Sequence, residues 1–351
     1  MKVSIIVPTY NEEQCIAACL DSILAQTCKD IIEILVVDAC STDSTLGIIE
    51  SFRTKNDKIR VFTNHKRHVP YAWNIGIRNS HGDLICIEGA HSYLSKDYIE
   101  RCVELHREHP DFDNIGGKSV VLPRNDTLTA RAVAMAISHP LGIGKAQYRQ
   151  ANKPCFVYTL FPGCYKRTVF SRVGLYDERL VRGEDQEIND RILKSGGKIY
   201  LDPSIQSFFY ARGTLKGMVL LYFRTGKSIP CTSRVMSRVI SVRQLAPLAY
   251  FSALGASLLL AVAGRYAGVS TIASTVPLLL VSGVYTLAIV AASVVQAFKN
   301  RTPSFAFLLP VVFFLLHAGY AIGTLHGLIT LRGWWNRNKD YKVGKLTDME
   351  V

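Results

Sequence analysis

An acidic residue and a histidine, Glu88 and His91, follow the apolar stretch 84–87. A carboxylate and an imidazole just beyond a buried strand can hold a divalent cation, and the cation can in turn bind a diphosphate. The structural alternative is that Glu88 is a solvated strand end and that His91 caps the next helix. We treat both residues as candidate metal ligands.

A second acidic group, Glu184 and Asp185, follows Gly183 and precedes an amphipathic segment over 186–195. A helix N-terminus favours negative charge, so this position should keep Asp185 ionised. The alternative is that the pair serves only as a helix cap.

The elements that must position these groups alternate between strands and helices. Branched apolar runs predict strands over 3–8, 33–37, 59–62 and 83–88, and helical spacing predicts helices to about 25, over 45–53 and over 71–79. This order predicts an α/β fold with a mostly parallel central sheet, and ligands bind at the carboxyl ends of such strands. Further along we expect helices over 98–109, 126–137, 168–173 and 186–195, strands over 114–122 and 198–201, and a substrate-covering loop over 142–157.

The charge distribution separates the two halves of the chain. The formal net charge is +13, and no acidic residue occurs between Asp202 and Asp340. Because basic residues flank long apolar runs there, an anionic membrane surface is the favoured partner and nucleic acid is not expected. The nine cysteines form no CxxC pair, so we expect reduced thiols and a cytosolic face.

The second half predicts a membrane region. We assign 1–210 to a catalytic domain, 211–244 to basic interfacial amphipathic helices, 245–331 to about three transmembrane helices and 332–351 to a basic tail. Three crossings would export the basic tail, which conflicts with the positive-inside rule. The third span, 305–331, contains one proline and three glycines, so it could instead be broken or re-entrant. The side of the tail stays open.

Several short motifs resemble those of family-2 glycosyltransferases of the GT-A fold. They are Val7-Pro8-Thr9-Tyr10-Asn11-Glu12, Val37-Asp38 with Ser41-Thr42-Asp43, Asn74-Ile75-Gly76, Gly82-Asp83 and Gly183-Glu184-Asp185. The resemblance extends over the whole chain and is strongest to the ExoA-type succinoglycan glucosyltransferases. It implies a GT-A nucleotide-binding domain followed by an α-helical membrane region.

The resemblance also implies roles for individual residues. Pro8, Tyr10 and Glu12 would line the nucleotide pocket, Asp38 would accept hydrogen bonds from the base or ribose, and Asn74 belongs to the same nucleotide-sugar site. Asp185, with Glu184 beside it, would be the general base that deprotonates the acceptor hydroxyl.

The sequence departs from this subgroup at the metal turn. The subgroup usually reads Asp-Ala-His, whereas this chain reads Gly89-Ala90-His91. Glu88 lies one residue earlier, and on an extended strand its side chain would point to the opposite face. It can replace the aspartate only if the backbone already turns at Gly89, which a glycine permits. We expect Mg or Mn as the cofactor, with Glu88 and His91 as its ligands.

The expected function is that of a membrane-bound inverting glycosyltransferase. It would move a sugar from a nucleotide-diphosphate sugar to a polyprenyl-diphosphate-linked acceptor in exopolysaccharide or cell-surface glycan synthesis. We expect a multi-pass protein of the inner membrane with a cytoplasmic catalytic domain, and other polysaccharide assembly enzymes are candidate partners. The candidate contacts to acceptor or lipid phosphates are Lys166, Arg167, Arg224 and Lys227, which could equally anchor the lipid surface.

Two alternatives stay open. A polyprenyl-phosphate sugar synthase would use the lipid phosphate itself as acceptor and would need no general base. A non-catalytic nucleotide-sugar-binding scaffold in the membrane would explain the glycine at position 89.

Overall fold

The computed structural model describes residues 1–143 and 147–346, and these residues form two compact units. The first unit comprises 1–121, 147–210 and 338–346. The second comprises 122–143 and 211–337.

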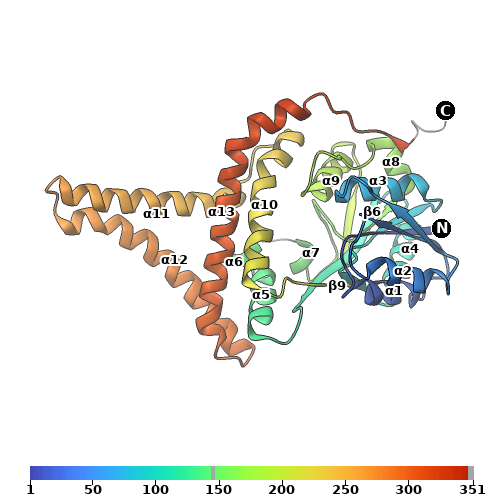
Figure 1. Ribbon diagram of the computed structural model, residues 1–351, viewed down its shortest axis with the longest axis horizontal. Coiled ribbons are helices and arrows are strands. Elements are labelled where there is room, and N and C mark those ends of the chain that lie inside the picture. Colours follow the sequence, from blue (N-terminus) through green and yellow to red (C-terminus); the bar gives the residue numbers. More distant parts are fainter. Residues whose placement is uncertain (144–146, 347–351) are drawn as a thin grey trace. The chain divides into compact units, whose positions relative to one another are not determined.

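A mixed sheet forms the centre of the first unit (Figure 1). Half of the sheet is parallel and has the order β3-β2-β1-β4. These strands are β1 (Val3–Thr9), β2 (Ile31–Asp38), β3 (Ile59–Thr63) and β4 (Leu84–Ile87). Their buried, branched apolar side chains are typical of strands covered on both faces. The predicted α/β fold is confirmed, and Thr9 pairs with Asp38 at the carboxyl edge.

The rest of the sheet is antiparallel where pairings are resolved, and the sequence predicted it only in part. It consists of β8 (Gly163–Lys166), β6 (Asn114–Leu122), β9 (Ile199–Tyr210), β5 (Ser92–Leu94) and β7 (Cys155–Phe156). Strand β9 is longer than the predicted 198–201, and β5 and β8 were not predicted. These two strands are only three and four residues long, too short for an alternating pattern to be recognised.

Helices cover both faces of the sheet. On one face lie α1 (Ile16–Leu24), α2 (Thr45–Arg53) and α4 (Tyr98–Glu108), which bury apolar residues against β1 and β2. On the other lie α3 (Val69–Asn79), α8 (Arg167–Val173) and α9 (Glu184–Lys194). The described part of the predicted loop 142–157 contains the short helix α7 (Gln147–Gln150) and strand β7, whereas 144–146 lie outside the described residues.

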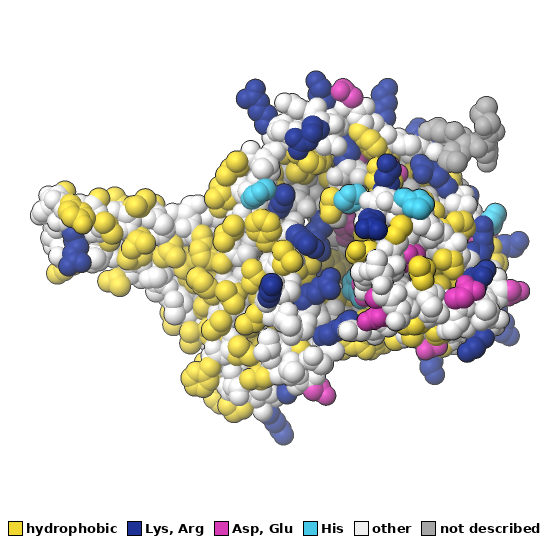
Figure 2. All heavy atoms as spheres, in the orientation of Figure 1, with side chains coloured by type: hydrophobic (Ala, Val, Ile, Leu, Met, Phe, Trp, Pro, Cys, Tyr) yellow, Lys and Arg dark blue, Asp and Glu magenta, His cyan; other side chains and the backbone are white. Residues whose placement is uncertain are grey.

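The second unit is entirely helical in its described elements. It contains α5 (Leu128–Ser138), α6 (Pro140–Ile143), α10 (Leu215–Val235), α11 (Val242–Tyr266), α12 (Thr271–Lys299) and α13 (Phe305–Asn338, whose last residue belongs to the first unit). Helices α11, α12 and α13 are long and apolar enough to span a membrane. Figure 2 shows that hydrophobic side chains cover the α11–α12 hairpin.

Two details differ from the predicted membrane region. Helix α13 continues without interruption past Pro310, so a break in the helix, one of the alternatives left open for the third span, is not found. Proline is tolerated inside long apolar helices when neighbouring groups satisfy the backbone carbonyl that it leaves without a partner. Residues 215–235 form one helix, α10, whereas several interfacial helices were expected over 211–244.

The predicted tail 332–351 is divided between the two units. Residues 332–337 complete α13 within the second unit, and 338–346 belong to the first unit, where Leu346 packs against the α3–α8–α9 face of the core. Residues 347–351 lie outside the described residues.

Candidate functional site

The loops that follow β1 and β2 are joined by hydrogen bonds between side chains and backbone. Asn11 has a positive φ of 52°, and its Oδ1 accepts a hydrogen bond of 2.8 Å from the amide of Thr42. The amide of Asn11 donates to Ser41 Oγ at 2.9 Å, and that of Glu12 donates to Thr45 Oγ1 at 2.8 Å. The carboxyl edge of β1 and β2 is therefore a preorganised polar surface.

Asp38 ends β2 inside this surface. Its carboxylate accepts hydrogen bonds from the amide of Ser41 at 2.9 Å and from Ser41 Oγ at 2.5 Å. The side chain is buried, so these bonds fix its orientation. Ser41 was part of the recognised motif, but its direct role in holding Asp38 required the structure.

The predicted nucleotide-pocket residues of the first loop differ in exposure. Pro8 is half-buried within β1, and Tyr10 is 47% exposed, with the guanidinium carbon of Arg67 6.0 Å from the centre of its ring. An exposed aromatic ring next to a cation offers a face on which a nucleobase can stack. Their assignment to the nucleotide pocket stays a prediction.

The structure corrects the assignment of Glu88 as a metal ligand. Its side chain has no exposed surface, and its Oε1 accepts a short hydrogen bond from Ser92 Oγ. Burial raises the pKa of Glu88 to about 8 from its ordinary value of 4.5, with the Ser92 bond opposing this shift. A buried, protonated carboxyl is a poor ligand, and its offset from position 89 explains why it points into the core.

His91 lies instead near Glu12. Its Nδ1 is 3.4 Å from Glu12 Oε1, and about half of the His91 side chain is exposed. Among the described residues no group of three or more His, Cys, Asp or Glu side chains has the arrangement of a metal site. His91 and Glu12 are thus a two-residue set, which can hold a metal only when a diphosphate supplies further oxygens.

The acidic pair lies at the start of α9, as predicted. Gly183 precedes it with a φ of +84°, a left-handed conformation that favours glycine. Both carboxyl side chains are half-buried, and Glu184 Oε2 has no hydrogen-bond partner among the described residues. The sequence therefore placed this pair correctly on a helix N-terminus.

The charge state of the pair differs from the expectation. Burial, and secondarily the charge of Asp185, raise the pKa of Glu184 to about 8. Burial also raises the pKa of Asp185, although backbone amides and the cations Arg182 and Arg149 oppose the shift. Burial therefore opposes the effect of the helix N-terminus on Asp185, and the two neighbouring carboxyl groups titrate as a coupled pair.

Arg149 and Arg182 were missed by the sequence interpretation. Arg149 comes from α7, and its guanidinium carbon lies 4.8 Å from the ring centre of Phe209. Arg182 precedes the acidic pair by two residues. The basic composition of the 142–157 loop was the available signal, but a sequence does not show which of its cations faces the carboxylates.

Asn74 is buried and supports the segment before α9. Its Nδ2 donates to the carbonyl of Tyr176 at 3.0 Å and to Glu178 Oε1 at 2.9 Å. Its Oδ1 accepts from the amide of Tyr176 at 2.9 Å. Both the amide nitrogen and the amide oxygen of Asn74 thus bind groups of the 176–178 segment. Asn74 therefore positions this segment, in place of the predicted contact with the nucleotide sugar.

Two of the four predicted phosphate contacts are at the wrong edge of the sheet. Strand β8 is antiparallel to β4, so Lys166 pairs with Leu84 at the amino end of β4. Lys166 Nζ donates to the carbonyl of Pro110, and Arg167 Nη1 donates to Ser80 Oγ at 2.8 Å. Lys166 and Arg167 therefore brace the edge opposite the ligand loops, because an unpredicted antiparallel strand reverses their direction.

The other two predicted phosphate contacts, Arg224 and Lys227, lie on α10 in the second unit. Both side chains are exposed. Their role at acceptor or lipid phosphates stays a prediction.

Comparison with known proteins gives a family match. The profile described as "Glycosyl transferase family 2" matches residues 4–174. Among curated proteins, the chain is 29% identical over 335 residues to the dolichyl N-acetyl-alpha-D-glucosaminyl phosphate 3-beta-D-2,3-diacetamido-2,3-dideoxy-beta-D-glucuronosyltransferase of Methanococcus voltae. That match covers 93% of this chain and 97% of the relative.

Two further similarities agree. The succinoglycan biosynthesis protein ExoA of Rhizobium meliloti (strain 1021) is 25% identical over 250 residues, 70% of this chain and 74% of that protein. The solved structure of the mannosyltransferase PcManGT from Pyrobaculum calidifontis, in complex with GDP-Man and Mn2+, is 18% identical and has a TM-score of 0.57. It covers 93% of this chain and 87% of that chain, and it shows that the fold is shared.

Proposed function

We propose that this chain, whose residues 4–174 match the family 2 glycosyltransferase model, transfers a sugar from a nucleotide-diphosphate sugar to a polyprenyl-linked acceptor at a membrane. The family favours an enzyme over the non-catalytic scaffold. The observation that carries the mechanism is the half-buried pair Glu184 and Asp185 at the start of α9.

The donor would bind at the carboxyl edge of β1 and β2. Tyr10 offers a ring for the base, and the fixed carboxylate of Asp38 can accept hydrogen bonds from the base or ribose. The mannosyltransferase with the same fold was solved with GDP-Man, a nucleotide-diphosphate sugar, which supports this class of donor.

A divalent ion fits this site only together with the donor. His91 and Glu12 would hold it from the protein side, and Mn2+ in the related mannosyltransferase structure supports such an ion. When bound, Mg or Mn neutralises negative charge on the diphosphate leaving group.

Asp185 would act as the general base. Arg182 and Arg149 favour the ionised form of Asp185, and an ionised Asp185 can accept the proton of an acceptor hydroxyl. Its raised pKa brings it closer to neutral pH, where a base accepts a proton with the most driving force. Attack by the activated hydroxyl opposite the leaving diphosphate would invert the anomeric centre.

The acceptor would be a sugar linked to a polyprenyl diphosphate. The Methanococcus voltae relative is named for a dolichyl-phosphate-linked sugar acceptor, and ExoA is named for succinoglycan biosynthesis, which supports a lipid-linked acceptor in exopolysaccharide or surface-glycan synthesis. Arg224 and Lys227 are our candidates for contacts to its phosphates. The apolar helices support a multi-pass membrane protein. The inner membrane and a cytoplasmic catalytic domain are part of our proposal.

Membranes containing the full chain provide the test. Nucleotide release and sugar transfer would be followed with UDP-, GDP- and dTDP-sugars and lipid-linked acceptors, with and without Mn. Replacing Asp185 by Asn should lower transfer by about 10²- to 10⁴-fold while donor binding by calorimetry is retained. Glu184→Gln is the matched control, since it replaces a protonated carboxyl with a neutral amide and should be milder.

The test also separates the alternative acceptor. A polyprenyl-phosphate sugar synthase needs no general base, so full activity of Asp185→Asn with the lipid phosphate itself would support that enzyme instead. Loss of donor binding in Asp185→Asn would contradict its role as a base and indicate a role in the donor site.

A further inference from the structure

The C-terminal segment 338–346 is fixed to the catalytic unit by several contacts. The amide of Leu175 donates to the carbonyl of Gly344 at 2.8 Å, and Arg179 Nη1 donates to the carbonyl of Asn338 at 2.9 Å. The guanidinium carbon of Arg179 also lies 5.0 Å from the ring centre of Tyr341. If the chain spans a membrane, a segment docked in this way requires the end of α13 to lie on the same side as the catalytic domain.

The start of α13 is held to the same side through α5 and α6. Arg131 Nη2 donates to Thr302 Oγ1 at 3.2 Å, and His317 Nε2 donates to the carbonyl of Leu141 at 2.8 Å. The segment 122–145 leaves the first unit and returns to it, and it is shorter than the roughly 40 residues that two crossings need. Both ends of α13 are thus tied to elements that stay on the catalytic side.

The packing of α13 against α10 excludes a four-crossing arrangement. The two helices lie side by side (Figure 1), and glycines 319, 323 and 327 of α13 contact Val219, Phe223 and Lys227 of α10 in that order. The residue numbers rise together, so the helices are parallel. If α10, α11, α12 and α13 crossed in succession, α10 and α13 would be antiparallel.

Helix α10 is also unsuited to crossing on its own. Lys216, Arg224, Lys227 and Arg234 divide it into apolar stretches of at most seven residues, and Arg224 and Lys227 are exposed. A span needs about 20 predominantly apolar residues. The parallel pair therefore belongs outside the hydrocarbon centre, at the membrane surface.

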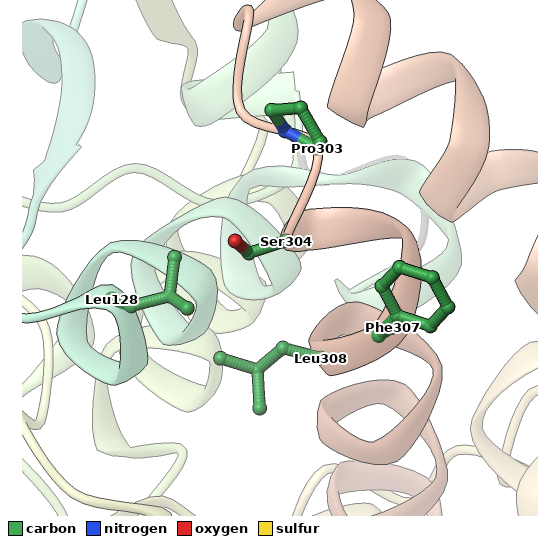
Figure 3. Close-up of a pocket in the computed structure, with 5 residues that line it drawn as sticks. All are labelled: Leu128, Pro303, Ser304, Phe307 and Leu308. Carbon is green, nitrogen blue, oxygen red and sulfur yellow. The ribbon is translucent and has the colours of Figure 1, made fainter.

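The exposed face of α13 has the composition of a membrane-embedded surface. A helical stripe of apolar side chains is exposed along its length, formed by Phe307, Val311, Phe314, Ile322, Leu325 and Ile329. An apolar pocket near the start of this helix is lined by Phe307 and Leu308 of α13 and by Leu128 of α5 (Figure 3). Because the same unit contains the apolar α11–α12 hairpin, the occupant of this face is lipid.

From these observations we propose that the chain crosses the membrane twice, through α11 and α12, and that α13 lies in the interface on the catalytic side. The arrangement resolves the conflict over the tail. Basic residues near the membrane ends then gather on the catalytic side (Arg234, Arg238, Arg243, Lys299, Arg301, Arg332 and Arg337), and Arg265 lies at the opposite end of α11. This distribution satisfies the positive-inside rule.

The inference rests on the proposed membrane location but not on the transferase chemistry. A parent chain would carry serine at the four cysteines that are not buried, which are Cys28, Cys40, Cys155 and Cys231. Single cysteines would then be introduced at four exposed positions, which are Lys55 in the catalytic domain, Val239 between α10 and α11, Tyr266 at the end of α11 and Lys342 in the tail.

Sealed vesicles of both orientations would be treated with a membrane-impermeant maleimide. We expect Tyr266→Cys to react from one side, and Lys55→Cys, Val239→Cys and Lys342→Cys to react from the other. Reaction of Lys342→Cys from the side of Tyr266→Cys would show three crossings and overturn the proposal. Reaction of all four from one side would mean that no helix crosses, while the transfer assay would still report independently on the enzyme.

A second measurement does not depend on the substitutions. The otherwise unaltered chain would carry one epitope at its N-terminus and another at its C-terminus, and vesicles would be treated with protease. We expect both epitopes to be protected in the same vesicle orientation. Protection in opposite orientations would contradict two crossings, even if a cysteine variant failed to fold.

Discussion

The buried carboxyl of Glu88 makes the stability of the catalytic unit depend on pH. Burial raises its pKa to about 8 in the folded protein, from an ordinary value of 4.5. Below pH 4.5 the group is protonated in both states and its contribution to stability is fully present. Between the two pKa values the unfolded chain releases a proton that the folded chain keeps, so this contribution falls as pH rises.

The size of this effect follows from the two pKa values. Each pH unit between them costs about 1.4 kcal/mol, so a change from pH 5.5 to 7.5 should lower the free energy of unfolding by about 2.7 kcal/mol, or roughly 100-fold in the folding equilibrium. Glu88→Gln cannot titrate and should lose this slope. Its absolute stability can shift either way, since the new amide hydrogens lack an obvious partner near Oε2.

Denaturant unfolding of the detergent-solubilised full chain at pH 5.5, 6.5 and 7.5 would measure the slope. The quantity to compare is the difference between parent and Glu88→Gln at each pH, because other titrating groups cancel in it. The exposed carboxylate variant Glu108→Gln is the matched control and should keep the parent slope. Mn-dependent donor binding by Glu88→Gln should equal that of the parent.

Two results would refute this reasoning. A difference between parent and Glu88→Gln that stays constant over the pH range would mean that the folded carboxyl is already ionised at pH 5.5. Loss of Mn-dependent donor binding with unchanged stability would return Glu88 to the metal site that the sequence first suggested.

Three further changes test the metal turn, the support of α9 and the helix pair. Gly89→Asp should strengthen Mn-dependent donor binding in calorimetry, because it adds a carboxylate next to His91; its Cβ lies 3.8 Å from His91 Cε1 and 3.2 Å from Ser92 Oγ, which must shift by a few tenths of an ångström. Unchanged binding would contradict this geometry. Asn74→Ala should lower the free energy of unfolding by about 1–3 kcal/mol by leaving buried groups of the 176–178 segment unpaired; an unchanged denaturation midpoint would count against that support. Gly323→Val should lower the melting temperature because its side chain would overlap the Phe223 carbonyl, whereas Gly283→Ala, where no atom lies within 4 Å, should be neutral.

The parallel half of the sheet was predictable because its signals are local. Runs such as Val3–Thr9 and Ile31–Asp38 are apolar and branched, and helical spacing in α1 placed Ile16, Cys19, Leu20 and Ile23 in the core. The antiparallel half depends on contacts between distant segments. Strand β8 has only four residues, and its pairing with β4 is what makes it a strand. Because this pairing was not predicted, Lys166 and Arg167 were assigned to the wrong edge of the sheet.

The charge states at the site were not predictable for a similar reason. A helix N-terminus favours an ionised Asp185, and this much can be seen in the sequence. Burial of the pair acts in the opposite direction and is stronger, but its extent depends on how separate elements cover the carboxyl groups. For Glu88, the one-residue offset from the usual aspartate indicated that the side chain would point away from the metal turn.

The topology of the membrane region shows how tertiary contacts decide what hydropathy leaves open. Three helices pass the same test of length and apolarity, yet α13 differs from α11 and α12 in burying one face against protein. Its glycines at 319, 323 and 327 permit backbone contact with α10, a spacing that is equally compatible with a transmembrane helix pair. Only the parallel direction of that pair, together with the docking of Gly344 on Leu175, fixes an even number of crossings. A basic tail on the catalytic side then follows from chain connectivity. The tail contacts Arg179, which lies five residues before the acidic pair Glu184 and Asp185 in the sequence.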